Sequence, residues 1–278
     1  MNLQKYFSAK RFVNCLKYDL ALNGKIYVLA IVVLFIILFI FDLLNLNALA
    51  DRIEYQAKYP QLNTNFKINT YFYNAYYQPI FIFFFISGLV ISAGTSFSAL
   101  RSSSKSISYI LLPASILEKY LVQFLVRIVA LSVLLFLLYW FTFKCAYLFY
   151  GIFEPVSETV KNYDILSVIK EVKLKSDLYV TCLAITMCSL FAFAGATYFK
   201  KFAIFKSVFT FGLITVFLFL LMVILSHIFY VHTSNELFSV KLLALPVNYK
   251  NNYFIALFTG ISLIMLLLAY FNLKEREA

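Results

Sequence analysis

The sequence predicts an all-α integral membrane protein with six transmembrane helices, preceded by an amphipathic helix at the membrane surface. Three observations support this fold class. The chain of 278 residues is 63% hydrophobic and contains 32 Phe and 21 Tyr, well above the roughly 45–50% apolar content of soluble domains. Six apolar segments are long enough to cross about 30 Å of hydrocarbon. A helix also satisfies its own backbone hydrogen bonds, which lipid requires of any spanning segment.

Residues 1–25 are polar and basic, and they are predicted to form the interfacial helix. On a helical wheel, at about 100° per residue, the apolar side chains occupy one third of the helix circumference. Lys10, Arg11 and Lys17 lie outside this apolar face, and Lys5 is the exception that lies within it. Such a helix lies flat with its basic face toward anionic lipid. It is either a general anchor or an elbow that moves the first span. Its apolar face comprises Tyr6, Ala9, Phe12, Val13, Leu16 and Leu20.

The six apolar segments belong to one transmembrane domain that covers residues 1–278. Pro79 suits the first turn of the second span, because its missing N–H leaves no helical bond unmade there. The tyrosine-rich stretch before Pro79 is typical of rings at the headgroup level, with a ligand-stacking site as the alternative. The predicted spans are residues 26–46, 79–100, 121–149, 178–199, 203–231 and 253–272.

Basic residues predict the orientation, because Lys and Arg are retained on the cytoplasmic side. With the N-terminus inside, the inner segments hold thirteen basic and four acidic residues, and the outer segments hold nine basic and eight acidic residues. The short turn at Lys200 and Lys201 is the strongest single indicator. Both termini are therefore predicted to be cytoplasmic, in an inner-membrane protein. The formal net charge of +11 then reflects topology and contact with anionic membrane lipid, and no nucleic-acid partner is expected.

Residues 101–120 form the predicted cytoplasmic loop between spans two and three. Arg101 to Ser108 is polar, Tyr109 to Leu112 is apolar, and Pro113 suits the start of a helix that continues into span three. The loop is long enough for a short interfacial helix. Its apolar side chains are unfavourable in water, so we expect lipid headgroups or a partner protein to cover them.

The stretch Phe97–Leu125 resembles the cytoplasmic segment of ABC-2-type transporter permeases from Bacteroidota-like bacteria. The shared pattern is Leu111-Leu112-Pro113-Ala114-Ser115, followed by Glu118-Lys119. The resemblance implies a permease subunit of an ABC exporter, paired with a cytoplasmic ABC ATPase, that moves a hydrophobic or amphipathic substrate outward. It implies a homodimer or a heterodimer with a similar permease.

The resemblance also implies that residues 101–120 are a coupling segment that docks in a cleft of the ATPase. Residues 199–206 would be a minor contact. Residues 233–252 would correspond to outer re-entrant helices, or they form a surface loop. The docking residues carried over are Leu111, Leu112, Pro113, Glu118 and Lys119, and charge and position add Arg101 and Lys105.

Ionisable side chains inside spans are candidates for function, because each costs at least about 2.5–3.5 kcal/mol at the membrane centre. Asp42, Arg127 and Lys144 lie near span ends, where snorkelling or a local ion pair explains them, and a transport route is the alternative. Small residues in spans two and four either pack helices or line that route. The candidate intramembrane polar site comprises Arg127, Ser92, Ser96 and His227.

The chain carries no motif of an enzyme. It lacks G-x-x-x-x-G-K-[ST], G-x-G-x-x-G and HExxH, and its four cysteines show neither CxxC nor zinc spacing. No cofactor or metal is expected, and ATP hydrolysis is expected in a partner subunit. The alternative function is a scaffold or sensor that docks a cytoplasmic partner through residues 101–120 without transport. A channel or ion-coupled carrier is disfavoured, because the spans lack paired carboxylates and an internal repeat.

Overall fold

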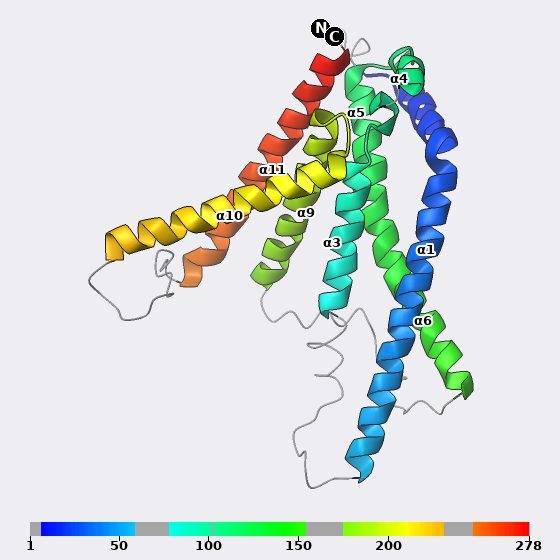
Figure 1. The fold of residues 1–278 in the computed structure, drawn as a ribbon. Coiled ribbons are helices and arrows are strands. Elements are labelled where there is room, and N and C mark those ends of the chain that lie inside the picture. The colour runs from blue at the N-terminus through cyan, green and yellow to red at the C-terminus, as the bar shows by residue number, and fades with distance from the viewer. Residues whose placement is uncertain (1–6, 59–77, 102, 154–174, 231–246, 278) are drawn as a thin grey trace. The chain divides into compact units, whose positions relative to one another are not determined.

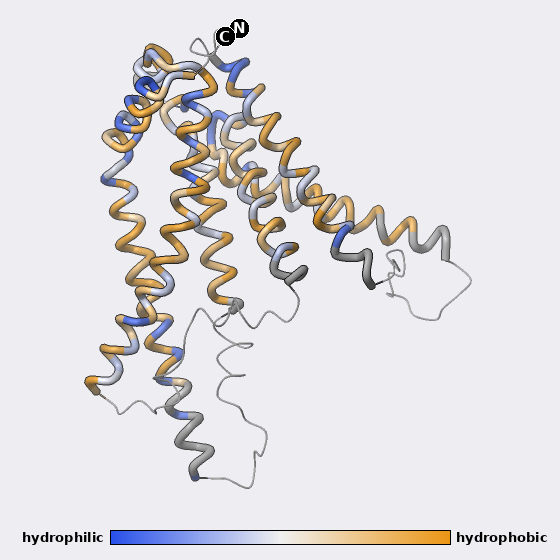
Figure 2. The backbone as a smooth tube through the Cα atoms, turned by 180° about the vertical axis from the view of Figure 1, so that it is seen from behind, coloured by the Kyte–Doolittle hydropathy of each residue, from blue (hydrophilic) through white to orange (hydrophobic). Residues whose placement is uncertain are grey.

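The structure, a computed structural model, describes residues 7–58, 78–101, 103–153, 175–230 and 247–277. This part of the chain consists of helices joined by turns and contains no strand. Within it, five helical stretches are long and apolar enough to cross a membrane, and Figure 2 shows hydrophobic residues along most of each. The protein is therefore all-helical and has the helices of a membrane-embedded protein. The five stretches are Ala9–Ala48, Ile116–Phe153, Tyr179–Tyr198, Ala203–Leu225 and Asn252–Arg276.

The chain divides into two compact units, which we describe separately. The first comprises Met1–Leu89 and Phe124–Lys173, and the second comprises Val90–Gln123 and Leu174–Ala278. The chain passes from one unit to the other within helix α3 (Gln78–Gly94) and again at the end of helix α5 (Ile116–Phe124).

Helix α1 (Ala9–Lys58) dominates the first unit and contains 50 residues. At 1.5 Å per residue it is about 75 Å long, more than twice the roughly 30 Å of hydrocarbon. The sequence predicted a change from interfacial helix to span near residue 25, but the helix is continuous there. The described part of α1 therefore joins both predicted segments in one rod, which must extend beyond the lipid at one end or both.

One face of α1 is buried, and it follows the i, i+4 spacing of a helix. Cys15, Asp19 and Asn23 are buried in its first half, and Leu38, Asp42 and Leu46 in its second half. The second half packs along helix α6 (Leu131–Phe153), as Figure 1 shows for these neighbouring helices. The buried side chains of α6 are Leu135, Tyr139, Thr142, Phe143 and Ala146.

The second predicted span is shorter than expected. Helix α3 ends at Gly94 instead of continuing to residue 100, and its apolar part is Ile80–Gly94. The chain leaves the helix over residues 95–97, where Phe97 adopts a left-handed conformation with φ of 55°. A bulky side chain is rarely found in this conformation, so tertiary packing must hold Phe97 in place.

The third predicted span continues the helix that precedes it, as the sequence predicted. Helix α5, the π-helical stretch η4 (Leu125–Ala130) and helix α6 form continuous helix from Ile116 to Phe153. The prediction began this span at residue 121, with a preceding helix from Pro113. A π-helical turn in an α-helix is rare and occurs often at functional sites.

The second unit contains helices α9 (Lys175–Tyr198), α10 (Ala203–Tyr230) and α11 (Val247–Glu277). Helix α9 packs along both α11 and α10. Its small residues are buried as the sequence predicted, and a Cβ atom at Gly195 would collide with the side chain of Ser207 on α10. Helix α10 exposes apolar side chains along most of its length. Such a surface is suited to lipid and not to water.

Candidate functional site

The predicted coupling segment, residues 101–120, lies in the second unit. It begins at the end of the 3₁₀ helix η3 (Ser98–Arg101) and continues as the short helix α4 (Ser103–Ile110). A turn over residues 111–115 then leads into α5. Serine-rich residues 103–108 are thus helical, although serine has little preference for a helix interior. Hydrogen bonds from charged side chains explain how the segment holds this shape.

Arg101 caps the C-terminal end of helix α3. Its Nη2 donates to the backbone oxygen of Gly94 at 2.7 Å and to that of Ser96 at 2.9 Å. The last carbonyl groups of a helix have no partner within the helix, and a cation there also interacts favourably with the helix dipole. Arg101 therefore stabilises the turn that follows α3.

Glu118 closes the start of α5 in a capping box with Ser115. The Ser115 backbone N–H donates to Oε2 of Glu118 at 2.7 Å, and the Glu118 N–H donates to Oγ of Ser115 at 3.2 Å. The Glu118 side chain is 0% exposed. The carboxyl is thus enclosed in this structure, and the predicted contact with a partner protein stays a prediction.

Lys119 caps the C-terminal end of helix α4. Its Nζ donates to the backbone oxygen of Ile110 at 3.3 Å and lies 5.2 Å from the ring centroid of Tyr109. The side chain is only 2% exposed. Lys119 therefore joins the start of α5 to the last residue of α4, and it is not presented at the surface.

Glu118 and Lys119 are buried, and the large exposed side chains described in the segment are apolar, although Ser108 is exposed as well. Leu111 is 76% exposed and Ile107 is 62% exposed, and Ile110 is also exposed. We call these three residues the apolar tip. Pro113 beside it is exposed, and Leu112 is half-buried. Lys105 belongs to α4, but its side chain lies outside the described residues.

The base of the segment is anchored to α9 and α11. The Phe97 ring is buried, 5.4 Å from the ring of Phe193 on α9, and its backbone N–H donates to Gln123 Oε1 at 3.5 Å. The Tyr120 hydroxyl donates to the backbone oxygen of Leu266 on α11 at 3.1 Å. These contacts hold the base of the segment against α9 and α11.

In the first unit, Arg127 forms part of a buried polar cluster. It lies in η4, and its guanidinium carbon is 4.6 Å from the ring centroid of Tyr27 on α1. Tyr27 donates to Asp19 Oδ2 at 2.8 Å, and Asn23 donates to Oδ1 at 2.9 Å. Arg127 and Asp19 are both buried. Arg127 is therefore enclosed and does not extend to the membrane surface, and the cluster joins α1 to the π-helical stretch inside the protein.

The remaining members of the predicted intramembrane polar site are Ser92, Ser96 and His227. Ser92 and Ser96 belong to the second unit; Ser92 is half-buried, and the Ser96 hydroxyl is buried without a hydrogen-bond partner among the described residues. His227 lies on α10, but its side chain is outside the described residues.

Several other hydroxyls within the spans bond to their own helices. Thr186, Thr210, Thr215 and Thr259 each donate to the carbonyl oxygen four residues earlier, at 2.7–2.9 Å. This bond satisfies a hydroxyl in lipid without any partner helix. These threonines therefore give no indication of a polar route.

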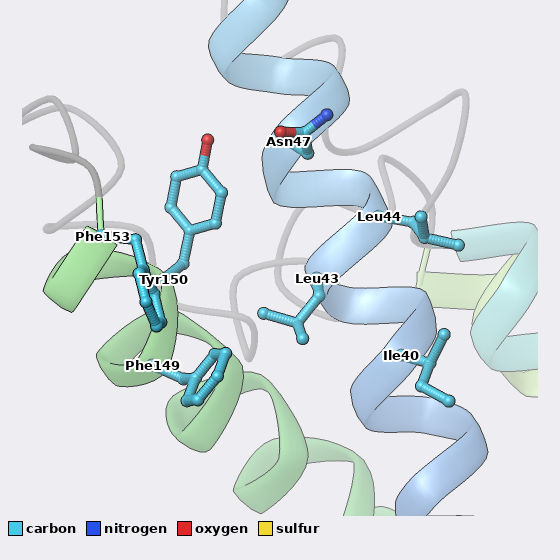
Figure 3. Close-up of a pocket in the computed structure, with 7 residues that line it drawn as sticks. All are labelled: Ile40, Leu43, Leu44, Asn47, Phe149, Tyr150 and Phe153. Atoms are coloured by element: carbon cyan, nitrogen blue, oxygen red, sulfur yellow. The ribbon is translucent and has the colours of Figure 1, made fainter.

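A groove lies between α1 and the end of α6, with a volume of about 450 Å³. Figure 3 shows Leu43 and Phe149 pointing toward one another, with Asn47 and Tyr150 at the same end of the groove. Ile40, Leu44 and Phe153 complete its lining. The groove is therefore apolar and carries an amide and a phenol at one end.

Asp42 is the ionisable residue whose position the sequence described least well. The sequence placed it near the outer end of span one, where snorkelling, a local ion pair or a transport route would explain it, and its side chain is 3% exposed. Its carboxyl group hydrogen-bonds with the side chain of Thr142 on α6. No sequence signal connects two residues a hundred positions apart.

Among the described residues, no group of three His, Cys, Asp or Glu side chains is arranged to hold a metal ion. Comparisons with protein-family models, with curated proteins and with solved structures found no match to this chain. A functional assignment must therefore come from the residues and contacts described above.

Proposed function

We propose that this chain is the permease subunit of an ATP-driven ABC exporter, in which residues 101–120 receive the movement of a separate cytoplasmic ATPase. The observation that carries the proposal is the construction of this segment. Arg101, Glu118 and Lys119 hold its shape from inside, and its exposed part is an apolar tip. An exposed apolar tip on a braced support is suited to a pocket in a partner protein.

The proposal places six spans in the inner membrane, with both termini in the cytoplasm. Helix α3 would be the sixth span, because its 17 residues measure about 25 Å and nearly cover the hydrocarbon. The N-terminal part of α1 would lie at the inner surface against anionic lipid. The permease would work as a homodimer or with a similar second permease.

Coupling would begin when ATP closes the ATPase dimer and displaces the apolar tip. The packed contacts of Tyr120 and Phe97 would pass this displacement to α11 and α9. The substrate would be hydrophobic or amphipathic. The groove between α1 and α6 supports this choice, since its apolar wall ends at two polar groups.

The direct test pairs this chain with a Walker-type ATPase encoded in a neighbouring reading frame, and the absence of such a frame would favour the scaffold. Leu111→Ser removes an exposed apolar contact and should cost the fold less than about 0.5 kcal/mol. If the tip docks as a central anchor, binding of the ATPase should weaken at least tenfold, and ATP-driven transport in proteoliposomes should fall with it.

Ile152→Ser is the matched control, because Ile152 is also 76% exposed but lies near the end of α6, on the predicted outer side. It should bind the ATPase as the wild type does. Wild-type binding and transport in both Leu111→Ser and Ile107→Ser would refute the proposal. Wild-type protein that binds the ATPase through the tip but moves no substrate would favour the scaffold.

The predicted orientation has its own test. A cysteine at Ser104, in a chain without other cysteines, should resist a membrane-impermeant maleimide in intact cells, whereas one at Ile152 should react. The opposite pattern would place the coupling segment outside and end the proposal.

A further inference from the structure

The turn between α9 and α10, in the second unit, concentrates positive charge. It carries Lys200 and Lys201, and Lys206 follows in the first turn of α10; all three side chains are exposed. From residue 178 to residue 235 the chain contains no Asp or Glu, so neither α10 nor the part of α9 that leads into the turn supplies an opposite charge. A cluster of cations of this kind attracts an anionic partner.

The end of helix α11 adds a fourth cation to this turn. Nη2 of Arg276 donates to the backbone oxygen of Tyr198, the last residue of α9, at 2.7 Å, although the two residues are 78 positions apart. A guanidinium in this place satisfies a carbonyl that has no partner within its helix, and it interacts favourably with the helix dipole. The bond holds the charge of Arg276 at the start of the turn, beside the lysines.

The other charges at the end of α11 do not cancel this excess. Lys274 lies about 200° around the helix from Arg276 and so faces away from the turn, and the exposed Glu275 lies about 100° away. The side chain of Glu277 lies outside the described residues. Even with both glutamates counted, residues 198–206 and 274–277 hold five basic and two acidic residues, a net charge of +3.

The turn keeps these charges together. Four residues connect the end of α9 at Tyr198 to the start of α10 at Ala203. The last of them, Phe202, has a left-handed conformation with φ of 53°, which a bulky residue rarely adopts. Close packing of the two helices at Gly195 and Ser207 fixes this short connection. The lysines therefore occupy a tight reversal between packed helices.

Exposed aromatic rings continue from the cations along α10. Phe202, Phe205 and Phe209 are 74%, 75% and 67% exposed. Phe205, Lys206 and Phe209 fall within about 100° of the helix circumference, so a cation lies beside the rings on one face. Nζ of Lys206 also lies 5.8 Å from the ring centroid of Phe199 in the turn. Aromatic side chains next to cations are typical of the boundary between hydrocarbon and headgroups.

We propose that Lys200, Lys201, Lys206 and Arg276 bind the phosphate headgroup of an anionic membrane phospholipid, whose acyl chains lie along the exposed rings of α10. Tyr179–Tyr198 and Ala203–Leu225 are each long and apolar enough to span a membrane, so the turn between them lies where two spans leave the hydrocarbon. A free phosphate ion would use the cations alone, whereas a lipid also uses the rings. The site stands whether or not the chain is a transporter.

A bound headgroup would connect the ends of three helices, because its contacts come from the turn between α9 and α10 and from α11. The competing occupant is the ATPase, since the family resemblance assigned residues 199–206 to a minor contact with it. The two occupants predict different results when the lysines are replaced.

The test identifies the lipid that lies beside the turn when the full chain is in vesicles. Trp140 is the one tryptophan of the chain, so Phe202→Trp combined with Trp140→Phe places a single fluorescent reporter at the turn. Brominated lipid quenches tryptophan only at close range. In mixed vesicles of phosphatidylcholine and phosphatidylglycerol, bromine on the anionic phosphatidylglycerol should quench more strongly than bromine on phosphatidylcholine.

The lysine variants measure what carries this preference. A basic residue near an anionic surface contributes about 1 kcal/mol, so Lys201→Gln should lower the preference for phosphatidylglycerol about fivefold. Lys200→Gln together with Lys201→Gln should remove most of it. Lys274→Gln is the matched control, because it removes the same charge from the same end of α11 on the face away from Arg276, and it should keep the wild-type preference.

Three results would overturn the proposal. The first is equal quenching by the two lipids in the chain with its lysines intact, both with this reporter and with one at Phe205→Trp, which leaves the turn unaltered. The second is displacement of the lipid by glycerol phosphate beyond the effect of sodium chloride at equal ionic strength, which would assign the cations to a free phosphate. The third is an unchanged lipid preference in the double lysine variant with weaker ATPase binding, which would assign the turn to the ATPase.

Discussion

Replacement of Glu118 distinguishes a residue that shapes the coupling segment from one that touches a partner. Glu118→Ala removes the acceptor of the Ser115 N–H, which now bonds to Oε2 at 2.7 Å. A hydrogen bond to a charged group contributes about 1.5–3 kcal/mol, so we take about 2 kcal/mol for the start of α5. At 1.4 kcal/mol per factor of ten, local opening should rise about 30-fold.

Hydrogen–deuterium exchange of a peptide that covers residues 115–120 measures this opening directly. Glu118→Gln is the matched variant, because the amide keeps an acceptor of the same length. It loses only the attraction between the carboxylate and the helix dipole, about 0.7 kcal/mol, so exchange should rise about threefold.

Two results would contradict this account of Glu118. Unchanged exchange in Glu118→Ala would mean that the capping box contributes little to the segment. Loss of ATPase binding in Glu118→Gln, with exchange close to the wild type, would mean that the carboxylate meets the partner directly, as the family resemblance implies.

The remaining predictions concern helix packing and the groove. Gly195→Ala should lower the free energy of unfolding by about 1–3 kcal/mol, because the new Cβ meets Ser207. The control Gly212→Ala on α10 places its Cβ in open space, so the free energy of unfolding should stay unchanged or rise slightly. Equal effects in SDS-unfolding titrations would refute the close approach of α9 and α10. In the same assay Asp19→Ala, which removes one buried and one part-buried hydrogen bond, should lower the free energy of unfolding by about 3 kcal/mol. Tyr27→Phe removes only the part-buried bond and should lower it by about 1 kcal/mol. The reverse order would contradict the cluster. Leu43→Trp should fill the groove and lower substrate-stimulated ATPase activity without loss of ATPase binding, and full stimulation would exclude the groove as a substrate site.

Part of the candidate site was readable from the sequence. The apolar residues Tyr109 to Leu112 already marked a stretch that water would not favour, whereas the exposed Ile107 lies in the part that the sequence analysis called polar. The spacing of Ser115 and Glu118 is a capping-box signature, a local pattern that is sufficient to indicate the role of Glu118. The capping of α4 by Lys119 has no comparable sequence signature, because the side chain bonds to the backbone of Ile110, nine positions earlier.

The sequence by itself determined that the chain is helical and suited to a membrane, because lipid requires long apolar segments whose backbone bonds are internal, and both properties are local. It also identified the small residues of α9 as buried. Only the tertiary structure decided which polar groups are enclosed. Asp42 meets Thr142, and Arg127 meets Tyr27, across a hundred residues of chain, and burial depends on the neighbouring helix. For the same reason, Glu118 and Lys119 of residues 101–120 are buried, whereas Ile107, Ile110 and Leu111 are exposed.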